Sequence, residues 1–261
     1  MKNHLKILCV LIIICACKQH KQEHTKIVNE KNDTLKPKNI LAKLATPKIS
    51  KERLLGKIDY KNDSLFVLVE SKYVSKPLYL NTVCFDSFKL MFNAAKNDGI
   101  DLKIISGARN FNYQKRIWER KWQTFSNLNP KERSQKILEY SAMPSTSRHH
   151  WGTDIDINSL SSSYFNSGKG AIEYNWLSKN ANRFGFYQVY TSKESGRTGY
   201  NEEQWHWSYL PIASQYLDDY NAIITVNDII GFNGAETAES LNIISDYVNG
   251  ISNEAQYYNR D

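Results

Sequence analysis

The chain has 261 residues, a formal net charge of +7 and 12% aromatic residues. The charge is uneven, because residues 18–50 hold eight lysines against three acidic residues, whereas residues 51–261 have no net charge. The larger part of the chain therefore lacks the basic excess typical of nucleic-acid-binding domains, and its length suffices for one hydrophobic core.

The first 17 residues are typical of an export signal. Two lysines precede an apolar run over residues 8–14, which is too short to span a membrane as a mature helix. Ala16 before Cys17 resembles a bacterial lipobox. We therefore expect cleavage, lipid attachment at Cys17 and a membrane anchor outside the cytoplasm. An ordinary secretory signal or a short uncleaved anchor is the alternative.

Composition separates a linker from a domain. Residues 18–50 are polar, rich in Lys and Asn and poor in aromatics, which predicts a flexible basic linker. The domain is predicted over 51–261, with a core at about 75–215 and a helical extension over 212–261 that packs on it. A lid or a wall-binding appendage is the alternative for that extension. Without the signal, Cys84 would be the only cysteine available besides Cys17, so no intrachain disulfide is expected.

The predicted elements alternate between helices and short strands. Asn81 and Gly99 bound a segment with helical apolar spacing that buries the Cys84 thiol, and Pro130 is suited to the first turn of another helix. A Ser/Gly/Asn-rich loop is predicted over 159–170. Helices are predicted over 81–97, 111–125, 130–140, 171–184, 213–220 and 236–248, and strands over 101–106, 153–157 and 186–190. Helices around a small, mainly antiparallel sheet give the α+β class.

Two segments about fifty residues apart carry the side chains of a catalytic zinc site. They read Ser-Arg-His-His-Trp-Gly-Thr-Asp-Ile-Asp over 147–156 and Glu-Gln-Trp-His-Trp over 203–207. Such a site takes three ligands from His, Asp and Glu, and needs a further carboxylate that accepts a proton from water. His149, Asp156 and His206 fit the ligands, and Glu203 fits the base.

Spacing alone leaves alternatives. His150 neighbours His149, and Asp154 shares a strand face with Asp156, so either member of each pair could be the ligand. Glu203 would face His206 only if the segment between them bends or makes a helical turn.

The same segments resemble the signature Ser-x-His-x-x-Gly-x-Ala-x-Asp and Glu-x-Trp-His-Trp of the VanY-like D-alanyl-D-alanine carboxypeptidases. This family belongs to the zinc peptidases that include lysostaphin-type enzymes and hedgehog-like domains. Residues 106–114 (Ser-Gly-Ala-Arg-Asn-Phe-Asn-Tyr-Gln) are similar to its Ser-Gly-Tyr-Arg-Ser…Gln stretch, and residues 174–186 to its helix followed by Gly-Phe. The resemblance covers roughly residues 75–215.

The resemblance implies one Zn²⁺ per chain and a role for each matching residue. It implies His149, Asp156 and His206 as metal ligands, Glu203 as the catalytic base, and Arg109 as the catalytic cation that also binds substrate. Gln114, Ser147 and Trp205 are implied as further substrate contacts or pocket walls. The chain departs from the family pattern at Ala108, Asn110, Asp154 and Ser208, which affects the substrate more than the chemistry.

The function implied by this resemblance is a zinc peptidase of the bacterial envelope. Its substrate would be a peptidoglycan stem peptide, with D-alanyl-D-alanine carboxypeptidase as the preferred activity. The alternatives are an L,D-carboxypeptidase or a peptidoglycan endopeptidase that uses the same site. A catalytically silent lipoprotein that binds wall peptides is a third hypothesis, but the intact ligand set and Glu203 argue against it.

Overall fold

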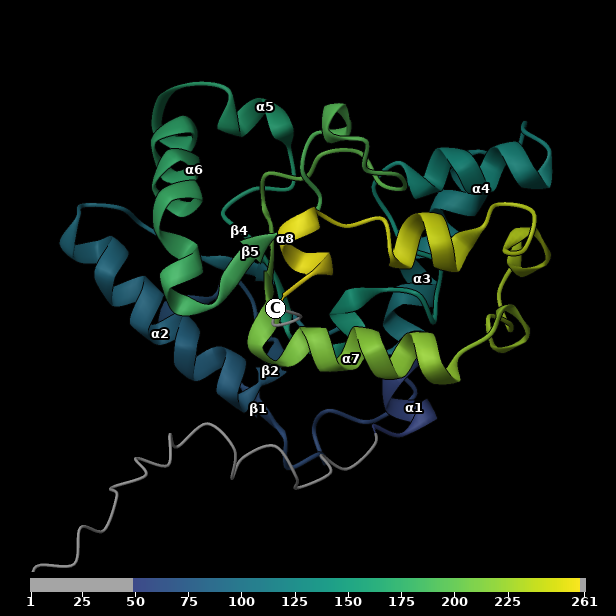
Figure 1. Ribbon diagram of the computed structural model, residues 1–261, viewed down its shortest axis with the longest axis horizontal. Helices are drawn as coiled ribbons and strands as arrows, with labels where there is room; N and C mark the ends of the chain where they lie inside the picture. Colours follow the sequence, from purple (N-terminus) through teal and green to yellow (C-terminus); the bar gives the residue numbers. More distant parts are fainter. Residues whose placement is uncertain (1–48, 259–261) are drawn as a thin grey trace, which may run out of the picture. The chain divides into compact units, whose positions relative to one another are not determined.

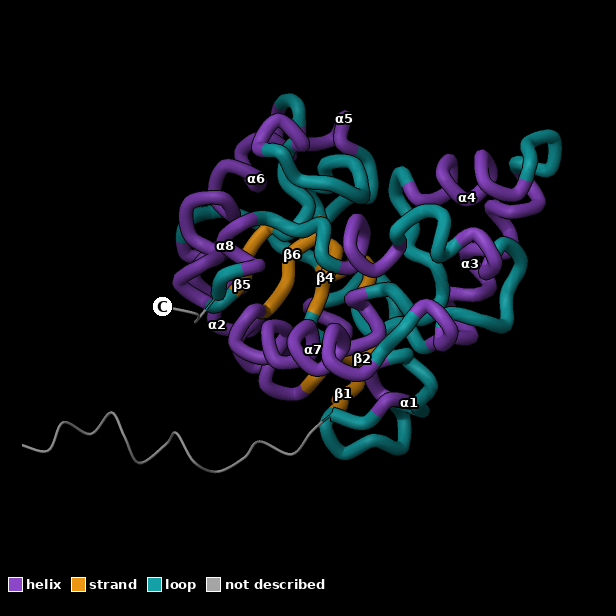
Figure 2. Tube along the Cα trace, turned by 45° about the vertical axis from the view of Figure 1, so that its right-hand side comes forward, coloured by secondary structure: helices purple, strands orange, loops and turns teal. Residues whose placement is uncertain are grey.

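A four-stranded antiparallel sheet organises residues 49–258, the part of the chain that the computed structural model describes. The strand order is β3–β4–β6–β5, and Figure 2 shows β4, β5 and β6 side by side among the helices. The strands are β3 (Ile104–Ser106), β4 (Asp154–Ile157), β5 (Phe186–Gln188) and β6 (His206–Tyr209). β1 (Phe66–Leu68) and β2 (Tyr79–Asn81) pair as a separate antiparallel ribbon. Together with the helices, this confirms the α+β class.

One face of the sheet packs on α2 and α6 (Figure 1). α2 begins where the Asn81 side chain accepts hydrogen bonds from the backbone N–H groups of Val83 and Cys84. Its apolar face meets the inward residues of β4, so that Ile155 is fully buried. The main helices are α1 (Lys51–Leu54), α2 (Thr82–Asn97), α3 (Phe111–Thr124), α4 (Pro130–Leu138), α5 (Ser162–Phe165), α6 (Gly168–Asn180), α7 (Leu210–Ile223) and α8 (Asn253–Gln256).

A second hydrophobic cluster joins α3, α4 and α7 to the C-terminal residues. Trp118 and Trp122 of α3 stack with ring centroids 6.3 Å apart, and Phe232 packs edge-on against Trp118. Ile243 and Val248 are buried in the same cluster. The described part of the tail therefore packs on α3, α4 and α7. None of the helices within residues 49–258 has the length and apolarity needed to cross a lipid bilayer.

Three sequence predictions differ from the structure. The predicted loop over 159–170 is wrong, because it contains α5 and the first turn of α6. The helix predicted over 171–184 begins earlier and ends in a 3₁₀ turn, Ala181–Phe184, before Gly185. The α-helix predicted over 236–248 is also wrong. Asn242 has a φ of 48°, which interrupts any continuous helix, and a single π-helical segment (Ile243–Val248) follows.

The N-terminal predictions lie outside the described residues. They comprise the signal peptide with its lipid site at Cys17 and the linker up to residue 48. Cys84 is among the described residues, and its predicted burial is confirmed. The thiol is free and buried, and its Sγ lies 3.6 Å from the carbonyl oxygen of Thr153.

Gly152 links the histidine segment to β4. Its φ of 70° lies in the left-handed region that favours glycine. A Cβ there would lie 2.3 Å from Cε1 of Phe66, and the Gly152 carbonyl accepts a hydrogen bond from the N–H of Asn81. The turn therefore needs glycine for both its backbone conformation and its close packing on the β1–β2 ribbon.

Candidate metal centre and substrate cleft

The register of β4 and β6 places two candidate ligands opposite each other. Asp156 is the cross-strand partner of His206, and Asp154 is the partner of Ser208. Because alternate residues of a strand share a face, these four side chains lie on the side of the sheet that faces away from the α2 core. Asp156 Oδ1 lies 3.2 Å from Nδ1 of His206.

His149 completes the group from the 3₁₀ turn Arg148–Trp151. Its Nδ1 donates a hydrogen bond of 2.8 Å to the carbonyl oxygen of Gly107, which leaves Nε2 as the nitrogen with a free lone pair. That Nε2 lies 3.4 Å from Oδ2 of Asp156. The ligand atoms of His149, Asp156 and His206 all lie within 4.8 Å of one another.

The three side chains fit a metal ion by their chemistry. His149 Nε2 and Asp156 Oδ1 are buried polar atoms without a hydrogen-bond partner among the described residues, and such atoms are costly unless a ligand binds them. Burial lowers the pKa of His149, which keeps this imidazole neutral. Two nitrogens and one carboxylate within 4.8 Å of one another match the donor set of a catalytic zinc site.

The alternative ligands have other partners. His150 donates from Nδ1 to the carbonyl oxygen of Arg109 (2.5 Å), and its Nε2 accepts from the N–H of Ser145 (3.0 Å). Burial lowers the pKa of His150 to about 3, so it stays neutral. Both of its nitrogens are used, so only His149 of this pair presents a free one to the site.

Asp154 forms a hydrogen bond with the His206 nitrogen that points away from Asp156. Its Oδ2 accepts from Nε2 of His206 and from Nε of Arg148, both at 2.9 Å, while the hydroxyls of Thr153 and Ser208 donate to Oδ1. Burial opposes ionisation of Asp154, but the Arg148 guanidinium and His206 lower its pKa well below the usual range. The carboxylate therefore fixes the His206 tautomer so that Nδ1 faces Asp156.

Glu203 lies beside the ligands on a bend. The N–H of His206 donates to the carbonyl of Glu203 (3.2 Å), so the segment makes the turn that sequence spacing left open. Glu203 Oε2 lies 3.6 Å from Nδ1 of His206. Burial raises the pKa of Glu203 to about 7, against the lowering effect of His206. A carboxylate with such a pKa can both accept and release a proton near neutrality.

A cleft of about 440 Å³ opens beside Glu203 and Asp156, and Arg109 and Trp205 line it. Trp205 packs against Tyr140 with ring centroids 6.2 Å apart. At its inner end a chamber of about 20 Å³ is lined by Ser147 together with His149, His206 and Glu203. That volume holds one water-sized group.

The backbone of Arg109 is fastened to the histidine segment. Its N–H donates to the carbonyl oxygen of His149 (3.0 Å), and its own carbonyl accepts the bond from His150. The structure therefore brings seven of the predicted site residues to the cleft or its inner chamber: His149, Asp156, His206, Glu203, Arg109, Ser147 and Trp205.

Gln114 is placed elsewhere. Its side chain is fully buried in α3, donates to the carbonyl of Ala142 (2.7 Å) and lines neither the cleft nor the chamber. Sequence reasoning also missed Arg148, whose ion pair with Asp154 is buried at both ends. The signal was the pair of charges at positions 148 and 154 that flank a histidine segment, but their pairing depends on a tertiary contact.

Comparison with known proteins gives matches over the same region. The VanY family model, described as D-alanyl-D-alanine carboxypeptidase, matches residues 77–212, more than half of the chain. YodJ of Bacillus subtilis (strain 168) is 32% identical over 134 residues, 51% of this chain and 46% of that protein. A protein of Enterococcus faecalis (strain ATCC 700802 / V583) named D-alanyl-D-alanine carboxypeptidase is 30% identical over 47% of this chain and 45% of its own length. The chain thus spans about half the length of these curated relatives.

A solved structure is similar as well. It is the vancomycin resistance D,D-pentapeptidase VanY from the VanB-type cassette, a mutant in complex with Zn(II). The likeness has a TM-score of 0.48 at 23% sequence identity, over 66% of this chain and 93% of the other. The family model covers the histidine segment, β4 and the Glu203–Trp207 segment together. The chain belongs to the VanY family of D-alanyl-D-alanine carboxypeptidases.

Proposed function

We propose that this protein is a zinc-dependent D-alanyl-D-alanine carboxypeptidase that trims peptidoglycan stem peptides. The observation that carries the proposal is the convergence of His149, Asp156 and His206 within 4.8 Å, with the Glu203 carboxylate 3.6 Å from His206. Membership of the VanY family and the name of the Enterococcus faecalis relative support the substrate.

Each residue has one task in this proposal. His149, Asp156 and His206 would hold the metal, and bound Zn²⁺ supplies a Lewis acid that lowers the pKa of a coordinated water toward ~7 and polarises a carbonyl. Glu203 takes a proton from the attacking water and delivers it to the leaving amine. Arg109 binds the carboxylate or developing oxyanion of the substrate, for which a guanidinium is suited because it stays charged.

The surrounding residues keep this geometry in place. Asp154 and Gly107 orient the two imidazoles through hydrogen bonds to their second nitrogens. Trp205 and Tyr140 form an aromatic wall that limits water at the reacting bond. Ser147 lines the inner chamber, where it can bond to the substrate carbonyl or to water.

The activity and its dependence on metal are tested together. We expect wild-type protein with Zn²⁺ to release one terminal alanine from a pentapeptide ending in D-Ala-D-Ala, as measured by mass spectrometry. A chelator should abolish the reaction and added Zn²⁺ should restore it, because no side chain of the site can replace the metal as a Lewis acid. Continued turnover in the chelator would contradict the role of the metal, and an intact pentapeptide with Zn²⁺ would contradict the activity.

The cellular location is proposed from the N-terminal sequence. Stem peptides lie outside the cytoplasmic membrane, and the lipobox-like Ala16-Cys17 would attach the protein there through a lipid. We expect Cys17→Ser to move the protein from the membrane fraction to the soluble fraction in an immunoblot. The matched control is Cys15→Ser, which should stay in the membrane fraction. Membrane retention of the Cys17 variant would contradict the anchor.

A further inference from the structure

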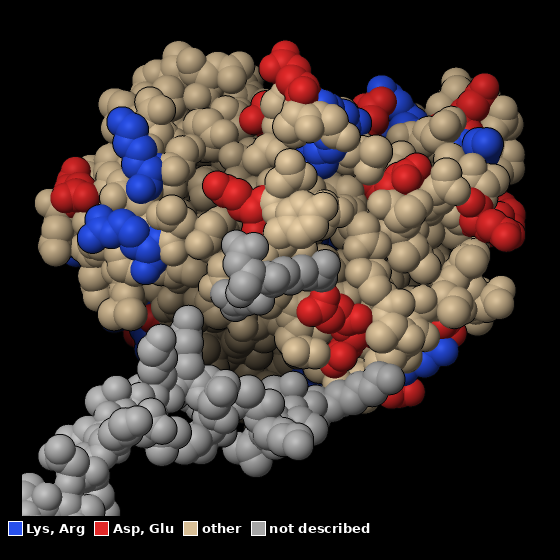
Figure 3. All heavy atoms as spheres, viewed as in Figure 1, with Lys and Arg blue, Asp and Glu red and all other residues tan. Residues whose placement is uncertain are grey.

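The cleft beside the metal centre has a local excess of positive charge. Five basic side chains line it: Lys76, Arg109, Arg116, Arg120 and Lys121. The only carboxylates on its lining are Asp156 and Glu203, which belong to the candidate metal centre. Residues 51–261 have no net charge, and on the face seen in Figure 3 acidic and basic side chains are interspersed. The excess is therefore a property of the cleft and not of the whole domain.

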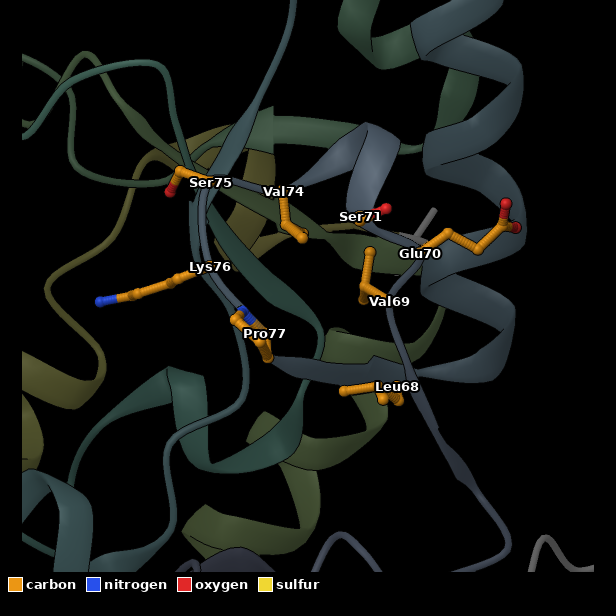
Figure 4. A pocket seen from close by; sticks show the side chains of 8 residues that line it. All are labelled: Leu68, Val69, Glu70, Ser71, Val74, Ser75, Lys76 and Pro77. Atoms are coloured by element: carbon orange, nitrogen blue, oxygen red, sulfur yellow. The ribbon is translucent and has the colours of Figure 1, made fainter.

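None of these five cations forms an ion pair among residues 49–258, where every such pair involves other basic residues. Lys76 and Glu70 lie in the same segment, but Figure 4 shows their side chains extending in opposite directions around a pocket. Glu70 pairs with Lys72 instead, at 3.2 Å. Lys121 donates a hydrogen bond to the hydroxyl of Ser141 (2.6 Å), a neutral group.

A rigid helix presents two of these cations. Arg116 and Arg120 are four residues apart on α3 and therefore share one face of it. Both are exposed, whereas Gln114, Trp118 and Trp122 bury the opposite face in the core. The cleft wall is thus fixed in position, while its two guanidinium groups remain available to a ligand.

The position of these arginines indicates which part of a substrate they meet. A carboxypeptidase has one residue on the leaving side of the cleaved bond, and one alanine fills a small part of a cleft of about 440 Å³. The remaining space must hold the chain on the other side of that bond. Arg109, next to the metal ligands, suits the terminal carboxylate, so the α3 arginines would meet a group farther along the peptide.

We propose, on the basis of the proposed carboxypeptidase function, that the cleft selects acidic peptides. Arg116 and Arg120 bind a second carboxylate, carried by a residue upstream of the cleaved bond. Guanidinium groups suit this task because they bind carboxylates through two parallel hydrogen bonds. Lys76 and Lys121 add to the positive potential that attracts such a peptide.

Two pentapeptides that differ in one group test this proposal. Both end in D-Ala-D-Ala. Their second residue is a glutamate linked through its side-chain carboxyl, so that its α-carboxyl group is either a free carboxylate or the corresponding carboxamide. With wild type at low salt we expect kcat/KM to be about tenfold higher for the carboxylate peptide, and the advantage should shrink as salt screens the charges. In Arg116→Gln/Arg120→Gln the ratio should fall to about one, whereas Lys115→Gln, on the same helix but outside the cleft lining, should keep it.

The outcomes separate this inference from the function on which it rests. Equal turnover of both peptides by wild type, or an unchanged ratio in the double variant, would overturn the second carboxylate site and leave the carboxypeptidase intact. If wild type cut neither peptide, the proposed function would fail. Calorimetric binding of the same two peptides would then test the second carboxylate site on its own. Tighter binding of the carboxylate peptide, lost in the double variant, would support the site, and equal binding would reject it.

Discussion

Replacing Glu203 with alanine is expected to abolish turnover while the protein still binds its metal. Glu203 lies beside the candidate ligands, with Oε2 3.6 Å from Nδ1 of His206, and it is the carboxylate of the cleft that lies outside the ligand group. Positioned proton transfer contributes on the order of 10²–10⁴-fold to a rate, and we expect a loss of that size in kcat/KM. Mass spectrometry of the released alanine gives the rate, and elemental analysis gives the bound zinc.

Glu202→Ala is the matched control, because this neighbouring acid is exposed and does not line the cleft. It should keep both activity and zinc. Activity in Glu203→Ala near that of the control would remove Glu203 from the mechanism. Loss of zinc from Glu203→Ala alone would instead make Glu203 a metal ligand.

Replacing Arg148 with alanine should have the largest effect on stability. Its guanidinium lies 2.9 Å from Asp154 and 2.7 Å from the Ser208 hydroxyl, and the side chains of Arg148 and Asp154 are 1% and 0% exposed. The variant would leave the buried Asp154 carboxylate without its guanidinium partner, with only His206 and two hydroxyl groups as hydrogen-bond donors. Breaking a buried ion pair in this way costs about 3–5 kcal/mol. We expect a decrease of that size in the free energy of unfolding, measured by urea denaturation of metal-free protein.

An exposed ion pair of the same length provides the comparison. Lys136 and Glu139 are also 2.9 Å apart, but their side chains are 49% and 40% exposed. Water screens such pairs, so Lys136→Ala should cost below about 1 kcal/mol. Equal losses in the two variants would show that burial is not what makes the Arg148 pair important.

The candidate ligands could be predicted from the sequence because they come from two short segments. His149 and Asp156 are seven residues apart, with Gly152 turning the chain between them, and His206 follows Glu203 within one turn. The choice between Asp154 and Asp156 could not follow from spacing, because both lie on the same strand face. That choice depends on the register of β4 with β6 and on Arg148, which forms an ion pair with Asp154.

The helix prediction over 236–248 failed for a physical reason. Ala238, Leu241 and Val248 have helical spacing and are buried, as the pattern indicates. The backbone reaches this burial through a 3₁₀ turn and a π-helical segment, with Asn242 in a left-handed conformation between them. Contacts with α7 and the rest of the second hydrophobic cluster override local propensity there. Gln114 differs for a similar reason, since helix orientation directs it to the Ala142 carbonyl and away from the cleft.

The hydrogen bonds between Arg109 and the histidine pair have a consequence for protein engineering. The carbonyl of His149 and the ring of His150 hold both backbone groups of Arg109, and Gly107 in turn holds the His149 ring. Two chain segments about forty residues apart in sequence therefore form a single module. A chimera that exchanges only one of them with a relative would break the hydrogen-bonded fit between Arg109 and the candidate ligand His149. Recombination in this family should thus succeed when residues 106–110 and 147–156 are transferred together.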